Sequence, residues 1–450
     1  MPSPSGSAPE RTRLFWFLAK ELRELLASRA FWLLLLMIGP LVGHGFITAV
    51  DSYAEASGIG GGPAALAQGL SPLDGILVPA FGAYDLAVTL LFPFVAIRLV
   101  SAEKASGAWK LMLQAPLSLP AMLLAKGLAL VGAWLLAWMP GLLALLLWKA
   151  YGGWIYGPEL LNLLLGHLLR VILSCGVAVA AAAMANGAAS AAIATLGFTV
   201  GTWALEFVAA GRGGLLAKLA AYTPTAALRV FEQGELRLAT VVVAAALSLA
   251  GFALAAVWLA TRRTLPSRLA RSLAAVLVFA PILWGAAHLR PTWDLSENRR
   301  NSFPAADEAA LRQIRRPLAV TVYLAPEDPR LMDLDRNILS KLARILPRVD
   351  IENASHSSAG LFERAGDHYG EVWYQLDGRR AMSRSTTEPI VLETLYRLAG
   401  VEPPPRAAGG EYPGHPLAVR PKGAAPLFYA LWPLAVALAA WLHLRDRRRS

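Results

Sequence analysis

Two ionisable residues lie deep inside long apolar stretches of the chain, where a charge is costly. Asp85 stands in one stretch and Arg170 in another. If both stretches cross a membrane in the same direction, the two residues reach a similar depth, and an ion pair is the economical arrangement. His167 lies one helical turn from Arg170. Such charges mark either a structural pair or a substrate pathway, and the sequence leaves both interpretations open.

The sequence carries no pattern typical of catalysis or of metal binding. A P-loop requires GxxxxGK[ST], whose amides and lysine hold phosphates, and no such string occurs. The seven histidines form no HExxH pattern. Cys175 is the only cysteine, so the chain can form neither an internal disulfide nor a CxxC metal site. We therefore expect a protein that is not an enzyme and has no cofactor of its own.

Composition indicates that membrane helices position these residues. Of the 450 residues, 56% are hydrophobic and only 16% are charged, whereas soluble domains carry about 25% charged residues. About 20 consecutive apolar residues suffice to cross a bilayer. The predicted fold is therefore a mainly α, polytopic membrane protein of about eight transmembrane helices, with a small extracytoplasmic α/β domain.

The predicted spans follow from hydropathy alone. They are Ala30–Val50, Ile76–Val100, Ala121–Trp148, Glu159–Ala185, Ala189–Ala209, Ala239–Ala260, Leu273–Leu289 and Leu427–Leu444. The Ala/Gly-rich run Val177–Gly197 blurs the boundary between the fourth and the fifth span.

The net charge of +11 is concentrated in four basic clusters. They lie at Arg11–Arg29 before the first span, at Lys104 and Lys110 after the second, at Arg262–Arg271 between the sixth and seventh, and at Arg445–Arg449. If the spans alternate in direction, all four clusters fall on one side. The positive-inside rule then places that side and both termini in the cytosol. The charge thus reflects topology, and we expect no nucleic-acid partner.

The segment Ser101–Lys126 connects the second and third spans on the cytosolic side. It carries mixed charge, and its middle has helical spacing. A short amphipathic helix held between two spans is suited to contact a cytosolic partner. The residues expected to make that contact are Glu103, Lys104, Gly107, Leu111, Gln114 and Pro116.

This segment resembles the first cytosolic loop in permease subunits of type-2 ABC transporters. The family pattern of an acidic residue, a Gly, a Leu-rich turn, a Pro and a Lys is matched by Glu103, Gly107, Leu111, Leu113, Pro116 and Lys126. Ala108 stands where the family usually has Thr. The stretch Arg11–Arg263 resembles one whole permease of about six spans. Its start, Arg11–Arg29, predicts an amphipathic helix in the inner interface, either the family's connecting helix or a simple anchor.

The resemblance implies partners that the chain itself cannot replace. A cytosolic ABC ATPase, in two copies, would bind ATP and Mg²⁺, and the permease would pair with a second copy or a homologue within the membrane lipid. Gly197 and Gly201 form a GxxxG motif in the fifth span, a spacing that lets helix backbones approach closely. This motif serves either as a dimer seam, as the resemblance implies, or for packing within the chain.

The segment Arg290–Gly423 lies outside by the same alternation of spans. Near its start stand Asp294, Leu295, Ser296, Glu297, Asn298, Arg299, Ser302 and Pro317. These residues resemble the auxiliary component of gliding-motility-type ABC transporters, in which a span is followed by an Asp-Leu-Thr/Ser-Glu-Asn-Arg segment. The domain is shorter than that family usually has.

Local patterns in this segment predict an α/β domain of about a hundred residues. Strands are expected at Leu318–Leu324, Val349–Ile351, Gly370–Leu376 and Arg380–Ser383, and helices at Met332–Leu346 and Glu388–Leu398. Asp377-Gly378 is a strong hairpin signal. The Pro- and Gly-rich stretch Val401–Gly423 is expected to be a linker back to the last span.

These observations divide the chain into five parts. They are a cytosolic N-terminus and interfacial helix (1–29), a six-span permease domain (30–263), a seventh span (264–289), an extracytoplasmic auxiliary domain with a linker (290–423), and an eighth span with a basic tail (424–450).

The favoured hypothesis is a multi-pass permease subunit in a bacterial inner membrane, coupling ATP hydrolysis by a separate ATPase to export or to extracytoplasmic work. The alternative is a mechanotransmitter or assembly platform that moves no substrate, with a periplasmic partner for residues 290–423.

Overall fold

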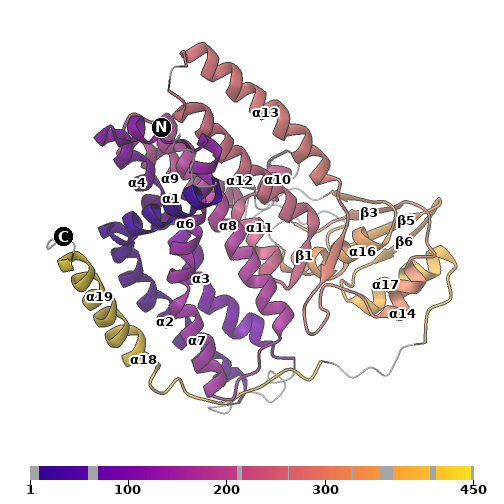
Figure 1. The fold of residues 1–450 in the computed structure, drawn as a ribbon. Coiled ribbons are helices and arrows are strands. Elements are labelled where there is room, and N and C mark those ends of the chain that lie inside the picture. Colours follow the sequence, from indigo (N-terminus) through magenta and orange to yellow (C-terminus); the bar gives the residue numbers. More distant parts are fainter. Residues whose placement is uncertain are drawn as a thin grey trace, which may run out of the picture.

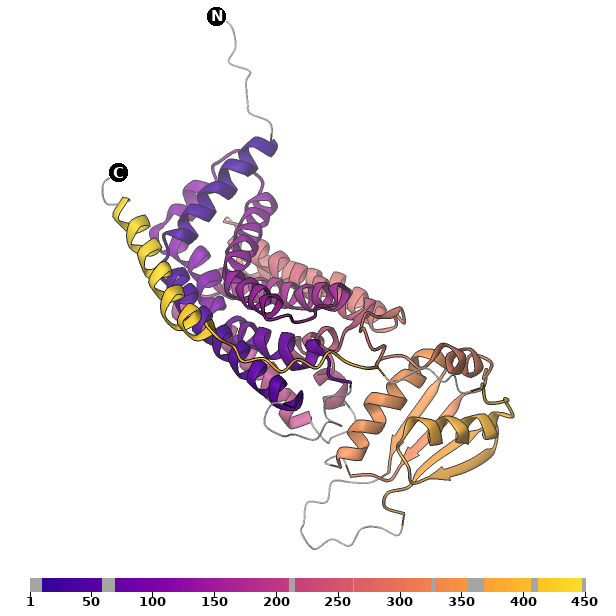
Figure 2. The same ribbon diagram turned by 90° about the horizontal axis from the view of Figure 1, so that it is seen from below.

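The computed structural model describes residues 10–58, 69–209, 215–261, 263–325, 328–354, 368–405 and 412–446. Arg262 and residues 447–449, which belong to predicted basic clusters, lie outside these ranges. Among the described residues, eight helices are long and apolar enough to cross a membrane. They form a helical body beside a small α/β domain (Figures 1 and 2). The prediction of a mainly α chain with eight such helices and a small sheet region is confirmed.

Five of the eight candidate spans are single helices. These are α2 (Arg29–Ala56), α8 (Gly157–Met184), α9 (Ala188–Ala209), α12 (Leu238–Leu259) and α13 (Leu265–Ala287). A turn at residues 185–187 separates α8 from α9, within the Ala/Gly run. Helix α13 begins eight residues before the predicted Leu273, because polar residues extend the helix beyond its apolar window.

The other three candidate spans are interrupted, unlike the unbroken runs that hydropathy predicts. The second span consists of a π-helical turn (Leu73–Leu77), α3 (Val78–Leu90) and α4 (Phe92–Ser106). The third consists of α6 (Leu119–Ala137) and α7 (Met139–Ala150). The last consists of α18 (Ala424–Pro426), a π-helical turn (Leu427–Leu431) and α19 (Trp432–Asp446). Pro93 and Pro140 stand at the second positions of α4 and α7. A proline lacks the amide hydrogen that continues a helix, so new helices begin there.

Four shorter helices complete the helical body. They are α1 (Glu10–Leu26), α5 (Ala108–Met112), α10 (Leu215–Ala220) and α11 (Pro224–Glu232). Helix α1 lies along α6: Arg13 donates to the Pro116 carbonyl, and Leu22 lies against Gly132. Helix α1 is therefore a packed part of the body.

Helices α8 and α12 pack with their backbones in direct contact. A Cβ atom on Gly251 would lie 2.6 Å from the carbonyl carbon of Gly176, and one on Gly176 would lie 2.8 Å from the Ser248 carbonyl oxygen. The two backbones therefore touch, as small residues allow in membrane helices.

The α/β domain contains a four-stranded sheet in the order β4-β3-β5-β6. Strand β3 (Leu318–Val322) is parallel to β4 (Val349–Asn353) and antiparallel to β5 (Val372–Leu376), which pairs with β6 (Arg379–Ser383). The helices are α14 (Ala305–Leu311), α15 (Pro329–Leu334), α16 (Ser340–Ile345) and α17 (Glu388–Ala399), with a π turn (Asp335–Leu339) joining α15 to α16. The predicted strand and helix positions are confirmed within a few residues.

The hairpin between β5 and β6 turns where the sequence predicts. Asp377 and Gly378 have φ values of 49° and 78°. Positive φ at both central residues is the requirement of a type I′ turn.

A second, two-stranded sheet joins the α/β domain to the helical body. Strand β1 (Glu235–Arg237), just before α12, pairs antiparallel with β2 (Thr292–Asp294), just after α13.

The described end of the predicted linker also packs on the body. The His415 amide donates to the Leu70 carbonyl, the Tyr53 hydroxyl donates to the His415 carbonyl, and the Tyr151 hydroxyl donates to the Lys422 carbonyl. Residues 412–423 therefore form a bound strap.

The backbone contact between α8 and α12 predicts a sharp difference among glycines. Gly251→Leu should lower the free energy of unfolding by about 1–3 kcal/mol, because the leucine side chain would force α8 and α12 apart. Gly82→Leu in α3 is the matched control, since Gly82 is exposed and a Cβ there meets nothing within 4 Å. Thermal unfolding in detergent checks this. An equal loss in both variants would contradict the packing.

Candidate functional site

The segment between α4 and α6 folds into a short helix held by a buried tryptophan. Gly107 has φ +76° and ends α4 in a left-handed conformation that glycine adopts without strain. Helix α5 follows at once, and the Ser118 hydroxyl accepts the Ala121 amide at the start of α6. The indole of Trp109, 4% exposed, donates to the Leu259 carbonyl at 3.0 Å. Helix α5 is thus fixed to the end of α12.

A closed ring of ion pairs lies beneath this helix. Lys126 Nζ of α6 lies 2.8 Å from Glu21 Oε2 and 2.7 Å from Glu103 Oε2. Lys20 Nζ of α1 lies 2.9 Å from Glu21 Oε1 and 2.6 Å from Glu103 Oε1. Each lysine therefore bridges the same two carboxylates. We call these four residues the ion-pair ring.

Three of the four side chains in the ion-pair ring are buried, whereas that of Lys20 is 36% exposed. The side chains of Glu21 and Lys126 are 0% exposed, and that of Glu103 is 6% exposed. Taking charges out of water is costly, and the cost is offset only when the partners lie close and are well aligned. Burial raises the pKa of the Glu21 carboxyl, opposed by the charge of Lys126. Burial lowers the pKa of the Lys20 ammonium, but hydrogen bonds and charges from Glu103 and Glu21 outweigh it, so the net pKa is raised.

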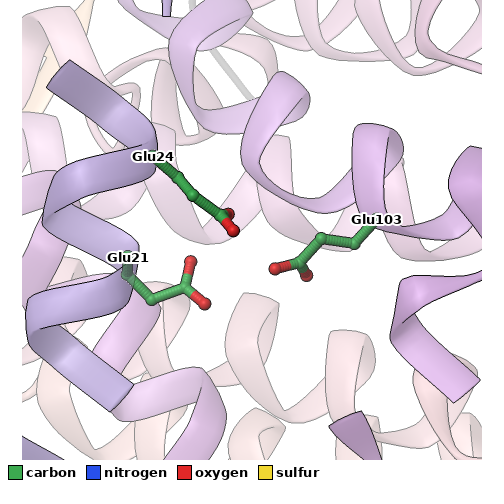
Figure 3. A group of neighbouring side chains, drawn as sticks. All are labelled: Glu21, Glu24 and Glu103. Carbon is green, nitrogen blue, oxygen red and sulfur yellow. The ribbon is translucent and has the colours of Figure 1, made fainter. Parts of the chain in front are cut away.

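Three carboxylates converge at this place, which raises the question of a metal ion. Figure 3 shows Glu21 and Glu24 from α1 facing Glu103 from α4, and their nearest oxygens all lie within 4.8 Å. Hard cations favour such oxygen ligands. However, Lys20 also reaches Glu24 Oε1 at 3.0 Å. The two ammonium groups already take the positions between the carboxylates, so we interpret the cluster as an ion-pair network and not as a metal site.

The structure divides the six predicted partner-contact residues into two groups. Leu111, Gln114 and Pro116 are exposed, and Leu111 is 69% exposed. Glu103 instead points inward to the ion-pair ring. Half-buried Lys104 donates to the carbonyls of Ala182, Ala183 and Ala185, each at 2.8 Å, at the end of α8.

Gly107 is also half-buried and serves as the hinge between α4 and α5. The exposed residues among the six therefore lie on α5 and in the turn after it, while Glu103 and Lys104 hold the segment to its neighbours. The sequence feature that points to the ion-pair ring is Lys126, a single charge at the start of an apolar run.

The two charges deep in the apolar stretches form an ion pair. Arg170 Nε of α8 contacts Asp85 Oδ1 of α3. The Arg170 side chain also donates to Thr89 Oγ1 at 3.0 Å. His167 is buried against the rings of Phe81 and Tyr84 and makes no hydrogen bond to the described residues.

Further charges lie close to this pair, around α11. Glu206 Oε1 of α9 accepts hydrogen bonds from the Thr223 hydroxyl and the Ala226 amide, and Glu206 Oε2 lies 3.2 Å from Arg229. Burial, reinforced by the charge of Asp85, raises the pKa of Glu232 to about 7. The glutamate at the end of α11 therefore titrates near neutral pH.

The GxxxG residues of α9 have open surroundings. Gly197 and Gly201 are exposed, and a Cβ on either would meet nothing within 4 Å. Among the described residues, therefore, none packs closely over these two glycines.

The Asp294–Ser302 segment fastens the α/β domain to the helical body. Asp294 accepts hydrogen bonds from Ser296, Asn301 and Ser302, which fixes the turn after β2. Arg300 donates to the Gln233 carbonyl and pairs with Asp74.

Further contacts with the body come from Glu297 of this segment and from Arg344 of α16. The Glu297 amide donates to Glu159 Oε1 at the start of α8, at 2.7 Å, and the Glu297 carboxylate accepts from Trp154 and Tyr412. Arg344 of α16 pairs with Glu235 of β1 at 3.2 Å. The junction is thus held by many directional contacts.

No protein-family model matches the chain, and no curated protein or solved structure matches it either. The site itself must therefore carry the functional argument.

The ion-pair ring predicts that Lys126 stabilises the protein far more than other lysines of the segment. Lys126→Met should cost about 3–5 kcal/mol, because it leaves two buried carboxylates sharing one lysine. Lys110→Met is the matched control, since Lys110 is exposed on α5. Thermal unfolding of both variants checks this, and similar melting temperatures would contradict the ring's role.

Proposed function

We propose that the chain is the membrane-spanning permease subunit of a bacterial ABC transporter, coupled to a separate ATPase. The observation that carries this proposal is the arrangement around α5. A short helix with an exposed turn is fastened to α12 by Trp109, and the ion-pair ring joins α1, α4 and α6 beside it. Lys20 of the ring also donates to Met112 of α5. Such a rigid, exposed element is suited to receive a push from a partner and pass it to several helices at once.

The charge distribution supports the orientation. The basic clusters favour the cytosol for the α5 side and for both termini. The proposed location is the bacterial inner membrane. The domain 290–423 then lies in the periplasm. Two ATPase subunits would bind ATP and Mg²⁺ below α5, and the open face at Gly197 and Gly201 would meet a second copy or a homologue. The Asp85–Arg170 pair would hold α3 to α8 during movement.

A second candidate function is force transmission without transport. It is favoured by the junction, where β1–β2 pairing, Arg300 and Glu297 fix the α/β domain to the helical body. Movement of α8 would then be carried directly into the outer domain and to a periplasmic partner. A continuous path between two copies would favour transport, whereas a sealed seam with a moving outer domain would favour transmission.

Cysteine cross-linking tests the proposed function. In a Cys175→Ala background, Gln114→Cys in native membranes should be shielded from an impermeant maleimide added outside and should cross-link to a protein labelled by 8-azido-ATP. Asp377→Cys, in the β5–β6 turn, is the control and should show the reverse pattern. Labelling of Gln114→Cys from outside, or no ATP-labelled adduct, would contradict the proposal.

A further inference from the structure

One end of the four-stranded sheet carries two neighbouring groups of polar and aromatic side chains. The members are Asp328, Arg330, Tyr369, Glu371, Trp373 and Arg384, which we call the edge cluster. They gather from the segment after β3, the start of β5 and the residue after β6. The backbone joins them too, since the Tyr323 amide donates to the Glu371 carbonyl and the Gly370 amide donates to the Tyr323 carbonyl.

The edge cluster lies at the end of the sheet that faces away from the junction. The start of β3 is near the junction, because the Leu318 amide donates to the Arg348 carbonyl and Arg290 donates to the neighbouring Pro347 carbonyl. The cluster lies beyond the other end of β3, roughly 16 Å along a five-residue strand.

Both carboxylates of the edge cluster are saturated by neighbouring donors. Asp328 accepts from the Arg330 guanidinium at 2.7 Å and from the Tyr369 hydroxyl at 2.8 Å. The Arg330 hydrogen bond is the main cause that holds the pKa of Asp328 well below its usual range. Both carboxylate oxygens of Asp328 therefore face donors of its own cluster.

Glu371 is saturated in the same way. It accepts from Arg384 at 3.1 Å and from the Trp373 indole at 3.0 Å, and His368 lies 3.0 Å away. The Arg384 hydrogen bond is the main cause that lowers the pKa of Glu371. Both oxygens of each carboxylate therefore accept hydrogen bonds from within the cluster.

What remains for a ligand is donor capacity and ring surface. The Arg330 and Arg384 side chains are 47% and 68% exposed. Each guanidinium has five N–H donors and is pinned to a carboxylate by only some of them. Arg330 also lies over the Tyr369 ring, 5.8 Å from its centroid. The edge therefore presents preorganised N–H donors beside aromatic rings, with its acceptors already used.

We propose that the edge cluster is a docking surface for an acidic segment of an extracytoplasmic protein partner. An arginine guanidinium can donate two parallel hydrogen bonds to one carboxylate. Tyrosine, tryptophan and arginine are the residues that carry most binding energy in protein interfaces. The inference goes beyond the proposed function, because it holds whether the chain transports a substrate or transmits force.

The test uses the full chain in zwitterionic lipid nanodiscs and a fluorescent decaglutamate peptide, measured by anisotropy. Arg330→Gln with Arg384→Gln should weaken binding at least roughly tenfold, a change of about 1.4 kcal/mol. Arg316→Gln is the matched control: Arg316 is 70% exposed and pairs with Asp377 at the opposite end of the sheet. It should change binding less than about twofold, as expected for an exposed ion pair.

Further measurements keep the proposal falsifiable. Replacing both arginines by lysine keeps the positive charge but removes the planar set of guanidinium N–H donors. The lysine variant should therefore lose less binding affinity than the glutamine variant and more than the parent protein. Equal melting temperatures show that the variants remain folded. An equal loss in the Arg316 control, no decaglutamate binding, full displacement by millimolar inorganic phosphate, or equal binding to anionic vesicles would each overturn the proposal.

Discussion

The Lys126 ammonium lies fully buried between the carboxylates of Glu21 and Glu103. A lone ammonium there would be prohibitively costly, and so would either acid without it. The positions of α1, α4 and α6 are therefore mutually dependent, since each supplies a charge that the others need. Lys20 closes the ring from α1 and also reaches Glu24. This constraint makes the contact of α1, α4 and α6 beside α5 rigid, so that a displacement of one of these helices would be passed to the others.

Helix α8 connects this group of helices to the opposite end of the molecule. Its last carbonyls accept hydrogen bonds from Lys104, and Glu159 at its start accepts one from the Glu297 amide in the segment after β2. These contacts are separated by most of a 28-residue helix, about 40 Å at 1.5 Å per residue. The backbone contact at Gly176 makes α12 follow α8, and α12 is tied through Trp109 to α5. The arrangement gives a continuous series of contacts from the exposed turn to the α/β domain, which either of the two proposed functions would use.

Much of the fold could be predicted because it depends on local pattern. Apolar length predicts the eight candidate spans, and Asp377-Gly378 predicts the hairpin. The interruptions at Pro93 and Pro140 were missed, because hydropathy does not register a missing amide hydrogen. The inward orientation of Glu103 could not be predicted, since its partner Lys20 is 83 positions away and the Lys126–Glu21 pair spans 105. The bound strap was equally hidden: Tyr53 and His415 are 362 positions apart. Long-range pairing, and not local periodicity, decides these features.

The central claim is that the ion-pair ring makes α1 and the α4–α6 segment one mechanical unit. Hydrogen exchange of the Glu103→Gln variant in nanodiscs tests it most directly. Glutamine keeps the size of the side chain but removes the charge that both lysines share. The account predicts a joint loss of amide protection in α1 and at the start of α6, with α13 unchanged as an internal reference. Loss confined to the residues around position 103, with α1 as protected as in the parent protein, would contradict it.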